Sequence, residues 1–402
     1  MSEAEAPEDD AGVVAAILAA IAAREPLSIS GNDGKRSMLR PVQAARGLSG
    51  RNLSGITLHS PAELVISARA GTPVPVIEAA LAEHGQHLVA EPPDLGRLLG
   101  TVAPATLGGM VAANLSGPRR IAGGAMRDHV LGVRAVNGEG TIIHSGGRVL
   151  KNVTGLDLCK LLAGSFGTLA VMTEITLKVL PAPESTATLA IPNLDPAQGV
   201  AALAASLGSP FGVSGAAYLP AAAAARVPEL GAVGEGVALA RIENFASSVA
   251  YRAGRLAAGL DRFGQSRLVE DEVSRAIWRA IRDAVPLAAG EEEAVWRVSV
   301  RPSAAPGLVH ALAAADARWF LDWGGGLVWI AAPAEAHSHQ AISAAVTAAG
   351  GTWILLRAPE ALRAGLDVLP PPSPVLARLT RRVKSAFDPH GILNPGRMYA
   401  GV

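Results

Sequence analysis

Apolar side chains recur at two spacings along the chain, and each spacing predicts a class of element. Residues 14–21 place them at helical spacing, so we expect a helix there with Asp9 or Asp10 as its N-cap. From Leu169 to Val179 apolar and polar residues alternate, which predicts a half-buried strand. Asn137-Gly138 separates two further apolar runs and is typical of a β-hairpin turn. The amino-terminal part therefore mixes helices with antiparallel strands.

After Pro181 the pattern becomes regular and rich in alanine. Residues 187–269 predict the order β-α-β-β-α-β, a ferredoxin-like unit, and residues 295–356 predict the same order again after an intervening helix. The last helix begins at Ser373 with Pro374 in its first turn. We expect its apolar stripe to be buried and its basic residues, Lys384 among them, to form a solvated face.

The length favours more than one domain, because 402 residues exceed the size at which a single hydrophobic core stops growing. The change of pattern places boundaries between residues 1–181, 182–369 and 370–402. The 35 basic and 35 acidic residues cancel, which argues against a nucleic-acid binder.

One cysteine, Cys159, cannot hold an iron–sulfur cluster or form an internal disulfide. The acidic start of the chain has the wrong sign for a secretory or mitochondrial signal. The apolar runs are shorter than the ~20 residues that span a bilayer, so we expect no direct membrane insertion and a cytoplasmic protein.

Glycine-rich loops hold the candidate chemistry. Neither a G-x-G-x-x-G fingerprint nor a Walker loop occurs. Four separate loops at residues 29–36, 103–120, 122–130 and 163–168 instead combine glycines with other small residues. Such backbone lets N–H groups converge on an anion and lets the chain approach a flat ligand closely. These loops favour a large, extended ligand with a diphosphate.

Residues 151–179 resemble the FAD-binding signature of the vanillyl-alcohol oxidase / p-cresol methylhydroxylase superfamily, as do the turn at 31–36 and the TLGGMVA string at 106–112. The D-P-x-G-I-x-N-P-G-R string at 388–397 is similar to the tail of its 2-hydroxy-acid-oxidising branch. Further strings resemble the FAD-binding E subunits of bacterial glycolate oxidases: ELVISARAGTPV, SGPRR, RDHVLG, VWRVSV, LDWGGGLVW and NPGRMYA.

The resemblance implies an α+β fold. It consists of a two-lobed PCMH-type FAD-binding domain, an α/β cap whose antiparallel sheet holds the two ferredoxin-like units, and a carboxy-terminal segment that returns to the FAD domain. Carried over by motif, the diphosphate would contact Gly31, Asn32, Asp33, Gly34 and Lys35, with Thr106, Gly108 and Gly109 as the second wall. Gly124 and Asp128 would lie near the ribityl and phosphate groups. The flavin pocket would include Lys151, Gly155, Asp157, Ser165, Gly167 and Thr168. Glu174 and Ile175 would line the adenine side. Asn394 and Arg397 would approach the isoalloxazine edge.

Two absences qualify the resemblance. No histidine lies between Pro26 and Ile56, and Cys159 sits in a different motif, so we expect non-covalent FAD. The catalytic members of the branch carry a His-rich metal cluster in the cap, and nothing similar occurs here, so we expect no metal. His337 and His339 form the one close pair, at a helix start where exposure is the simpler interpretation.

No catalytic residue follows from the motifs. The candidates are Arg119, Arg297, His390 and Arg397. The three arginines among them, and Arg120, could bind a carboxylate. By resemblance the chain is the FAD-binding subunit of a complex that oxidises glycolate, a small 2-hydroxy acid, to glyoxylate. Its partners would be a homologous FAD catalytic subunit and an iron–sulfur subunit, and it would be peripheral to the inner membrane only through them. A self-sufficient FAD-dependent hydroxy-acid or alcohol dehydrogenase and a non-catalytic FAD-holding scaffold stay open as alternatives.

Overall fold

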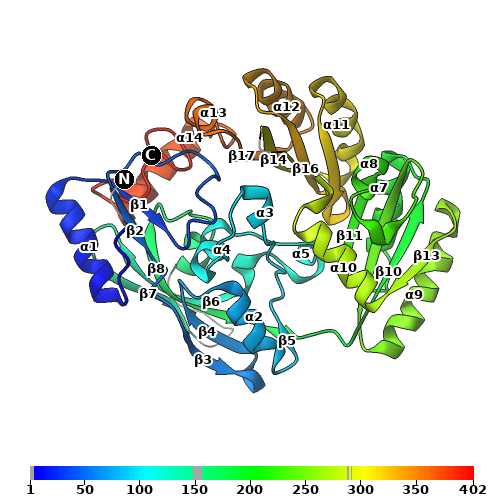
Figure 1. The fold of residues 1–402 in the computed structure, drawn as a ribbon, viewed down its shortest axis with the longest axis horizontal. Coiled ribbons are helices and arrows are strands. Elements are labelled where there is room, and N and C mark those ends of the chain that lie inside the picture. Colours follow the sequence, from blue (N-terminus) through cyan, green and yellow to red (C-terminus); the bar gives the residue numbers. More distant parts are fainter. Residues whose placement is uncertain (1–3, 148–155, 288, 291) are drawn as a thin grey trace. The chain divides into compact units, whose positions relative to one another are not determined.

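A computed structural model describes residues 4–147, 156–287, 289–290 and 292–402 (Figure 1). The chain forms two compact units. The first combines the residues up to Leu115 with Ala125–Ala182 and Pro371–Val402, and the second combines Ser116–Gly124 with Pro183–Pro370. We expected Ser116–Gly124 in the first domain. It belongs to the second unit, where Trp323 Nε1 donates a hydrogen bond to the carbonyl oxygen of Gly117 at 3.0 Å.

An antiparallel five-stranded sheet forms the centre of the first unit. Its order is β3 (Ile56–Ser60), β4 (Val65–Arg69), β8 (Ala170–Lys178), β6 (Val130–Asn137) and β7 (Ile142–Gly146). The predicted hairpin is confirmed as the β6–β7 pair, and the predicted half-buried strand is β8. Ile175 and Leu177 of β8 are buried in the larger of two hydrophobic clusters in this unit.

A second lobe of this unit is built on a parallel pair of short strands, β1 (Leu27–Ser30) and β2 (Arg46–Ser49). The chain returns to this pair near its end, where Leu27 forms a parallel bridge with Leu393. Leu27, Leu48 and Leu393 belong to the smaller hydrophobic cluster of this unit. Helix α1 (Asp10–Ala23) adds Val13 and Ile17 to that cluster. The carboxy-terminal segment is thus part of the first unit.

The first unit contains further helices and one more pair of strands. They are α2 (Val74–Ala82), α3 (Gly96–Leu99), α4 (Leu107–Ala113), α6 (Leu158–Leu162), the carboxy-terminal helix α14 (Pro374–Phe387) and the paired strands β5 (Gln86–His87) and β9 (Leu180–Pro181).

Helix α1 shows where the apolar pattern was ambiguous. Its start is as predicted, since the Asp9 side chain accepts a hydrogen bond from Gly12 N at 2.8 Å. Its buried face differs, because Leu18, which the spacing placed in the apolar stripe, is exposed. Nearly every position of this helix is Ala, Val, Ile or Leu, so several faces are almost equally apolar and periodicity does not select one.

One eight-stranded sheet forms the second unit. Its order is β13-β10-β12-β11-β15-β16-β14-β17. The strands are β10 (Ser185–Pro192), β11 (Val213–Pro220), β12 (Gly236–Asn244), β13 (Arg267–Glu270), β14 (Glu293–Ser299), β15 (Arg318–Asp322), β16 (Leu327–Pro333) and β17 (Thr352–Arg357). The helices are α5 (Arg120–Gly123), α7 (Pro196–Leu207), α8 (Ala221–Ala224), α9 (Ala246–Leu260), α10 (Asp271–Arg282), α11 (Ala305–Ala311), α12 (Ala336–Ala348) and α13 (Glu360–Gly365).

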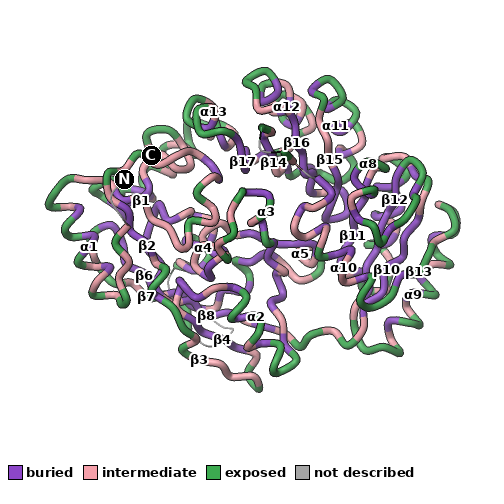
Figure 2. The backbone as a smooth tube through the Cα atoms, viewed as in Figure 1, coloured by how far each residue is buried: buried purple, intermediate pink, exposed green. Residues whose placement is uncertain are grey.

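This sheet confirms the two predicted ferredoxin-like units. In each half the fourth strand pairs with the first, the first with the third, and the third with the second. The halves join through their second strands, β11 and β15, where Tyr218 pairs with Leu321. Strands β10, β11 and β12 are buried over most of their length, as Figure 2 shows. The repeated order therefore produces one continuous sheet rather than two.

The carboxy-terminal helix α14 starts as predicted, but it buries a different face from the one we expected. The Ser373 side chain accepts a hydrogen bond from Leu376 N, with Pro374 in the first turn. Leu376 and Leu379, which we expected to be buried, are exposed, whereas Lys384, which we expected on the solvated face, is buried. The ammonium group of Lys384 finds three oxygen acceptors inside the unit, and this compensates its burial.

No helix in the described ranges is both long enough and apolar enough to cross a bilayer.

Candidate functional site

The glycine-rich loops of the first unit meet around one cleft of about 970 Å³, its open mouth included. Eleven of the residues assigned to the cofactor by resemblance line the cleft: Gly31, Asn32, Asp33, Gly34, Lys35, Thr106, Gly108, Gly109, Gly167, Asn394 and Arg397. The structure brings them together from both ends of the sequence, since the lining includes Gly31 and Arg397.

The turn after β1 presents backbone donors to this cleft. Asp33 has a φ of +56°, so the turn departs from the extended strand before it. No hydrogen bond within the described chain engages the backbone N–H groups of Asn32, Asp33 and Gly34. The Asn32 side chain ties the turn to the opposite wall by donating to Pro104 O at 3.1 Å. A concave turn with unused N–H groups is suited to an anion.

Glycine is required where the walls approach each other. A β-carbon at Gly31 would lie 2.3 Å from Thr106 Oγ1, and one at Gly108 would lie 2.9 Å from Ala70 Cβ. Gly109 differs, because its β-carbon would be 3.1 Å from Thr106 Oγ1 and 3.7 Å from the Nζ atom of Lys35. A side chain at Gly109 would therefore occupy the space beside the Lys35 ammonium group.

The Lys35 ammonium group lies in the cleft, and its pKa is low enough that an anionic ligand can change its protonation. Burial lowers its pKa to about 8, and the negative charge of Asp94 opposes this shift only in part. A bound diphosphate would favour the protonated form and raise the pKa again. Charge and unused backbone donors thus converge on the same part of the cleft.

The carboxy-terminal segment completes the wall. Asn394 accepts a hydrogen bond from Ile29 N at 2.8 Å and donates to the carbonyl oxygen of Phe166 at 2.8 Å. The Arg397 guanidinium donates to the carbonyl oxygens of Lys35 (2.8 Å) and Arg40 (3.1 Å). We expected these two residues at the isoalloxazine edge, which stays a prediction; the hydrogen bonds show that they hold the cleft's own loops in place.

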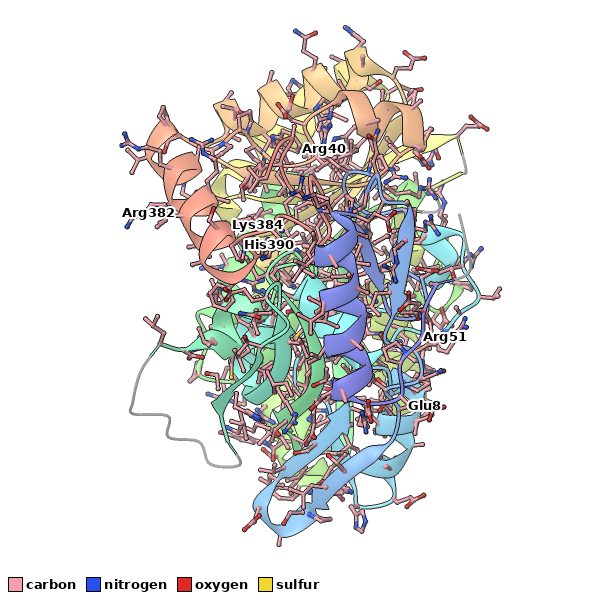
Figure 3. All side chains as sticks on the ribbon, turned by 90° about the vertical axis from the view of Figure 1, so that its left-hand side faces the viewer. Glu8, Arg40, Arg51, Arg382, Lys384 and His390 are labelled. Carbon is pink, nitrogen blue, oxygen red and sulfur yellow. The ribbon has the colours of Figure 1, made fainter. Side chains whose placement is uncertain are left out.

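The buried ion pair of Lys384 and Asp388 holds the carboxy-terminal segment in place. Lys384 Nζ donates to Asp388 Oδ2 at 2.6 Å, to Thr168 O at 2.7 Å and to Leu393 O at 2.7 Å. Asp388 in turn accepts from the backbone N–H groups of Ile392 and Leu393. In Figure 3, Lys384 points into the unit, whereas Arg382 on the same helix projects outward. Helix α14 therefore fixes the loop that contains Gly167.

Several predicted residues lie away from the cleft. Ile175 is wholly buried in the core, and the Glu174 carboxylate accepts a hydrogen bond from Thr57 Oγ1 at 3.0 Å. The Asp128 carboxylate accepts from Ala125 N and the Asp157 carboxylate from Lys160 N, so both cap short helical turns. Gly124 belongs to the second unit, where it follows α5. None of these residues lines the cleft.

Two further residues act on the cleft indirectly. Ser165 Oγ donates to Leu162 O at 2.8 Å, and Thr168 Oγ1 donates to Ser165 O at 2.7 Å. These bonds shape the turn whose Phe166 and Gly167 do line the cleft. Lys151 and Gly155 lie outside the described residues.

Apart from Arg36, the lining residues that the sequence did not predict are small or apolar. They are Ser28, Ile29, Ser30, Gly50, Ala70, Ala105, Ala112, Ala113, Phe166, Ala170, Val171 and Met172, together with Pro104 and Arg36. None except Arg36 has a side chain with distinctive chemistry. Their one usable signal is that most of them adjoin a predicted glycine-rich loop or β8.

The remaining candidates have defined surroundings. His390 is exposed in the turn after α14. Arg119 forms a two-point ion pair with Glu243 at 2.7 and 3.0 Å. His339, which we expected to be exposed, is buried; its Nδ1 accepts from Trp296 Nε1 at 3.3 Å, and burial lowers its pKa. In the described ranges no group of three or more His, Cys, Asp or Glu side chains is arranged to hold a metal ion.

Comparisons with known proteins define the family. The model named FAD binding domain matches residues 4–146, and the FAD linked oxidases, C-terminal domain model matches residues 372–398. The glycolate oxidase subunit GlcE of Escherichia coli (strain K12) is 35% identical over 383 residues, which cover 95% of this chain and 95% of that protein. This chain belongs to the GlcE family of FAD-linked oxidoreductases. The glycolate oxidase subunit GlcD of Bacillus subtilis (strain 168) is 43% identical over 84 residues, covering 21% of this chain and 18% of that protein.

Solved structures confirm the α+β fold expected from the resemblance. Substrate-bound p-cresol methylhydroxylase aligns with a TM-score of 0.75 at 14% identity, covering 99% of this chain and 88% of that chain. The 4-ethylphenol oxidase of Gulosibacter chungangensis aligns with a TM-score of 0.71 at 14% identity, covering 98% and 89%. At these identities the likeness shows the fold alone.

The cleft of this GlcE-family chain fits FAD, the cofactor of the family. The glycines at positions 31 and 108 make room by allowing close backbone approach. Unused N–H groups and Lys35 suit a diphosphate, and the apolar stretch Ala170–Met172 suits a flat ring. Both family models fall on segments that line or support this cleft.

Proposed function

We propose that this chain is the FAD-binding subunit of a complex that oxidises glycolate to glyoxylate. The observation that carries the proposal is the cleft of the first unit, whose glycines and unused donors match a diphosphate-containing cofactor. The identity to the Escherichia coli glycolate oxidase subunit, which extends over 95% of both proteins, supports the substrate class. Partial matches to D-lactate dehydrogenases agree with a small 2-hydroxy acid.

The proposed cofactor contacts start from the diphosphate. The turn at Asn32–Lys35 holds it, while Gly31, Gly108 and Gly109 keep the cleft free of side chains. Asn394 and Arg397 keep the loops in position. Bound FAD supplies the hydride acceptor for oxidation of the hydroxyl-bearing carbon. We propose that it is bound non-covalently, because none of the described side chains that line the cleft is a His, Cys or Tyr that could attach it.

The proposed assembly follows from what this chain lacks and what its relatives are called. GlcE and GlcD are named as subunits of glycolate oxidase. The single Cys159 leaves an iron–sulfur cluster to another chain. We therefore propose a homologous FAD catalytic subunit and an iron–sulfur subunit as partners, with the complex in the cytoplasm and reaching the inner membrane only through them.

Co-purification of the tagged chain tests the proposal. We expect one partner homologous to this chain and one iron protein, an acid-extractable flavin in the tagged chain, and flavin bleaching when glycolate is added anaerobically. Bleaching of the purified single chain by glycolate would instead favour the self-sufficient dehydrogenase. Full activity of a complex with a flavin-free variant of this chain would favour the scaffold. A tagged chain without flavin or partners would refute the proposal.

A further inference from the structure

Three sequence strings that the cofactor cleft does not use meet at one place in the second unit. SGPRR supplies Arg120 of α5, VWRVSV supplies Arg297 of β14, and LDWGGGLVW supplies Trp323 in the turn after β15. The guanidinium carbon of Arg120 lies 4.4 Å from the centre of the Trp323 ring, and that of Arg297 lies 4.7 Å from it. Two cations therefore stack on one indole.

Arg297 is an incompletely satisfied cation. Its Nη2 atom is buried and has no hydrogen-bond partner among the described groups. A buried N–H group without an acceptor is costly and calls for an explanation such as a missing ligand. Burial and the positive charge of Arg120 lower the pKa of Arg297 to about 10, although the negative charge of Asp322 opposes this shift. The group is still charged at neutral pH.

The nearby carboxylates are already engaged. Glu243 accepts from Arg119 and also pairs with Arg241 at 3.2 Å. Asp322 is buried, and its Oδ1 accepts from Trp323 N at 2.7 Å. Two arginines thus share Glu243, while the negative charge of Asp322 acts on Arg297. Neither carboxylate supplies the Nη2 atom of Arg297 with a hydrogen-bond acceptor.

The indole is held firmly in this position. Trp323 has a φ of +53°, a backbone conformation that a bulky residue adopts only at a cost. Its Nε1 is anchored on Gly117 O at 3.0 Å, which joins the SGPRR string to the turn. Segment α5 lies beside β11 (Figure 1), so the stack is built entirely within the second unit.

We propose that Arg120, Arg297 and Trp323 form a binding site for the carboxylate of a small hydroxy acid. A carboxylate would give the Arg297 Nη2 atom its missing acceptor, and the indole would cover the carbon skeleton. The inference rests on the proposed function, since the ligand would be the substrate acid. It assigns substrate binding to this chain's own second unit.

Calorimetric titration of the full-length, FAD-loaded chain tests the site at constant ionic strength. Glycolate is the probe, and ethylene glycol is its uncharged analogue of equal length. We expect wild type to bind glycolate and not ethylene glycol, and Arg297→Met to weaken glycolate binding by about tenfold or more. Arg297→Lys should bind better than Arg297→Met. Arg255→Met, at an exposed position on α9, is the matched control and should bind as wild type.

Other results would overturn the site. These are the absence of glycolate binding by wild type, equal binding of ethylene glycol, or a dissociation constant for Arg297→Met within twofold of wild type. Loss of partner association rather than of glycolate binding in Arg297→Met would assign the cations to an acidic side chain of a partner, which also refutes the proposal. If Arg297→Met does not fold, Arg120→Met decides by the same criterion.

Activity of the purified complex separates this inference from the proposed function. A complex that oxidises glycolate with unchanged KM in Arg297→Met refutes the carboxylate site and leaves the function standing. A chain that binds glycolate through Arg297, in a complex that never oxidises it, refutes the function and supports the site.

Discussion

The Nδ2 atom of Asn394 donates a hydrogen bond to the carbonyl oxygen of Phe166 over 2.8 Å, although 228 positions separate the two residues. The same side chain also accepts from Ile29 N. One amide therefore joins three segments that line the cofactor cleft. Its geometry requires a donor and an acceptor on the same side chain, which few residues supply.

Asn394→Asp should weaken FAD binding. The carboxylate keeps the size of the amide but places negative charge against the Phe166 carbonyl oxygen. We expect a stability loss of about 1–3 kcal/mol and a clear fall in FAD affinity. Flavin fluorescence titration and thermal unfolding measure the two effects. Asn52→Asp is the control, because Asn52 donates to Ala6 O from an exposed position. Equal effects in both variants would contradict the role of Asn394.

Gly109→Leu should abolish stable flavin occupancy. Its side chain would enter the space beside Lys35, where the diphosphate is proposed to lie. The flavin-to-protein ratio after gel filtration measures the effect. Gly259→Leu on α9 is the control, since its β-carbon would meet nothing within 4 Å and leucine favours a helix. A Gly109→Leu chain with full flavin content would remove the diphosphate assignment.

FAD affinity should depend on pH through Lys35. Burial lowers its pKa in the free cleft to about 8, and a bound diphosphate raises it. Lys35 is protonated in both states below pH 8, so affinity is constant there; above pH 8 binding requires proton uptake, and affinity falls by up to about tenfold per pH unit. Lys35→Met should bind more weakly at pH 7 and lose this dependence. A wild-type affinity that does not change between pH 7 and 9.5 would be inconsistent with this role.

Lys384→Met should destabilise the first unit. It would leave the Asp388 carboxylate buried without its cation, which typically costs about 3–5 kcal/mol. Arg382→Met, on the exposed side of the same helix, should change stability by less than about 0.5 kcal/mol. The double variant Lys384→Met/Asp388→Leu should recover part of the loss. Urea unfolding measures all three, and equal losses for Lys384→Met and Arg382→Met would disprove the contribution of the ion pair.

Much of the fold was predictable because local signals were strong. The second unit alternates short apolar strands with helices that have clear starts, such as the capping box of Asp195 and Gln198, so both ferredoxin-like orders could be predicted. The pairing of β11 with β15, which fuses the halves, carries no local signal. Helix faces were less predictable, because α1 is apolar on every side and Lys384 of α14 is buried by partners distant in sequence.

The candidate site was predictable where backbone conformation demands glycine. Gly31 and Gly108 could be proposed from the loops, since close approach selects for them. The side chains that share the cleft, such as Phe166 and Val171, are ordinary apolar residues whose position depends on tertiary packing. Glu174 and Ile175 lie outside the cleft lining, because Ile175 is buried in the core and the Glu174 carboxylate accepts a hydrogen bond from Thr57.

The return of residues 394–397 to the first strand sets an order of events in biosynthesis. Until translation has passed residue 397 and this stretch has emerged from the ribosome, the loops at Ile29, Lys35 and Phe166 lack the amide and guanidinium that hold them. Loading of the flavin therefore comes late, after nearly all of both units has been synthesised, and a ribosome stalled before that stretch would display a protein without colour.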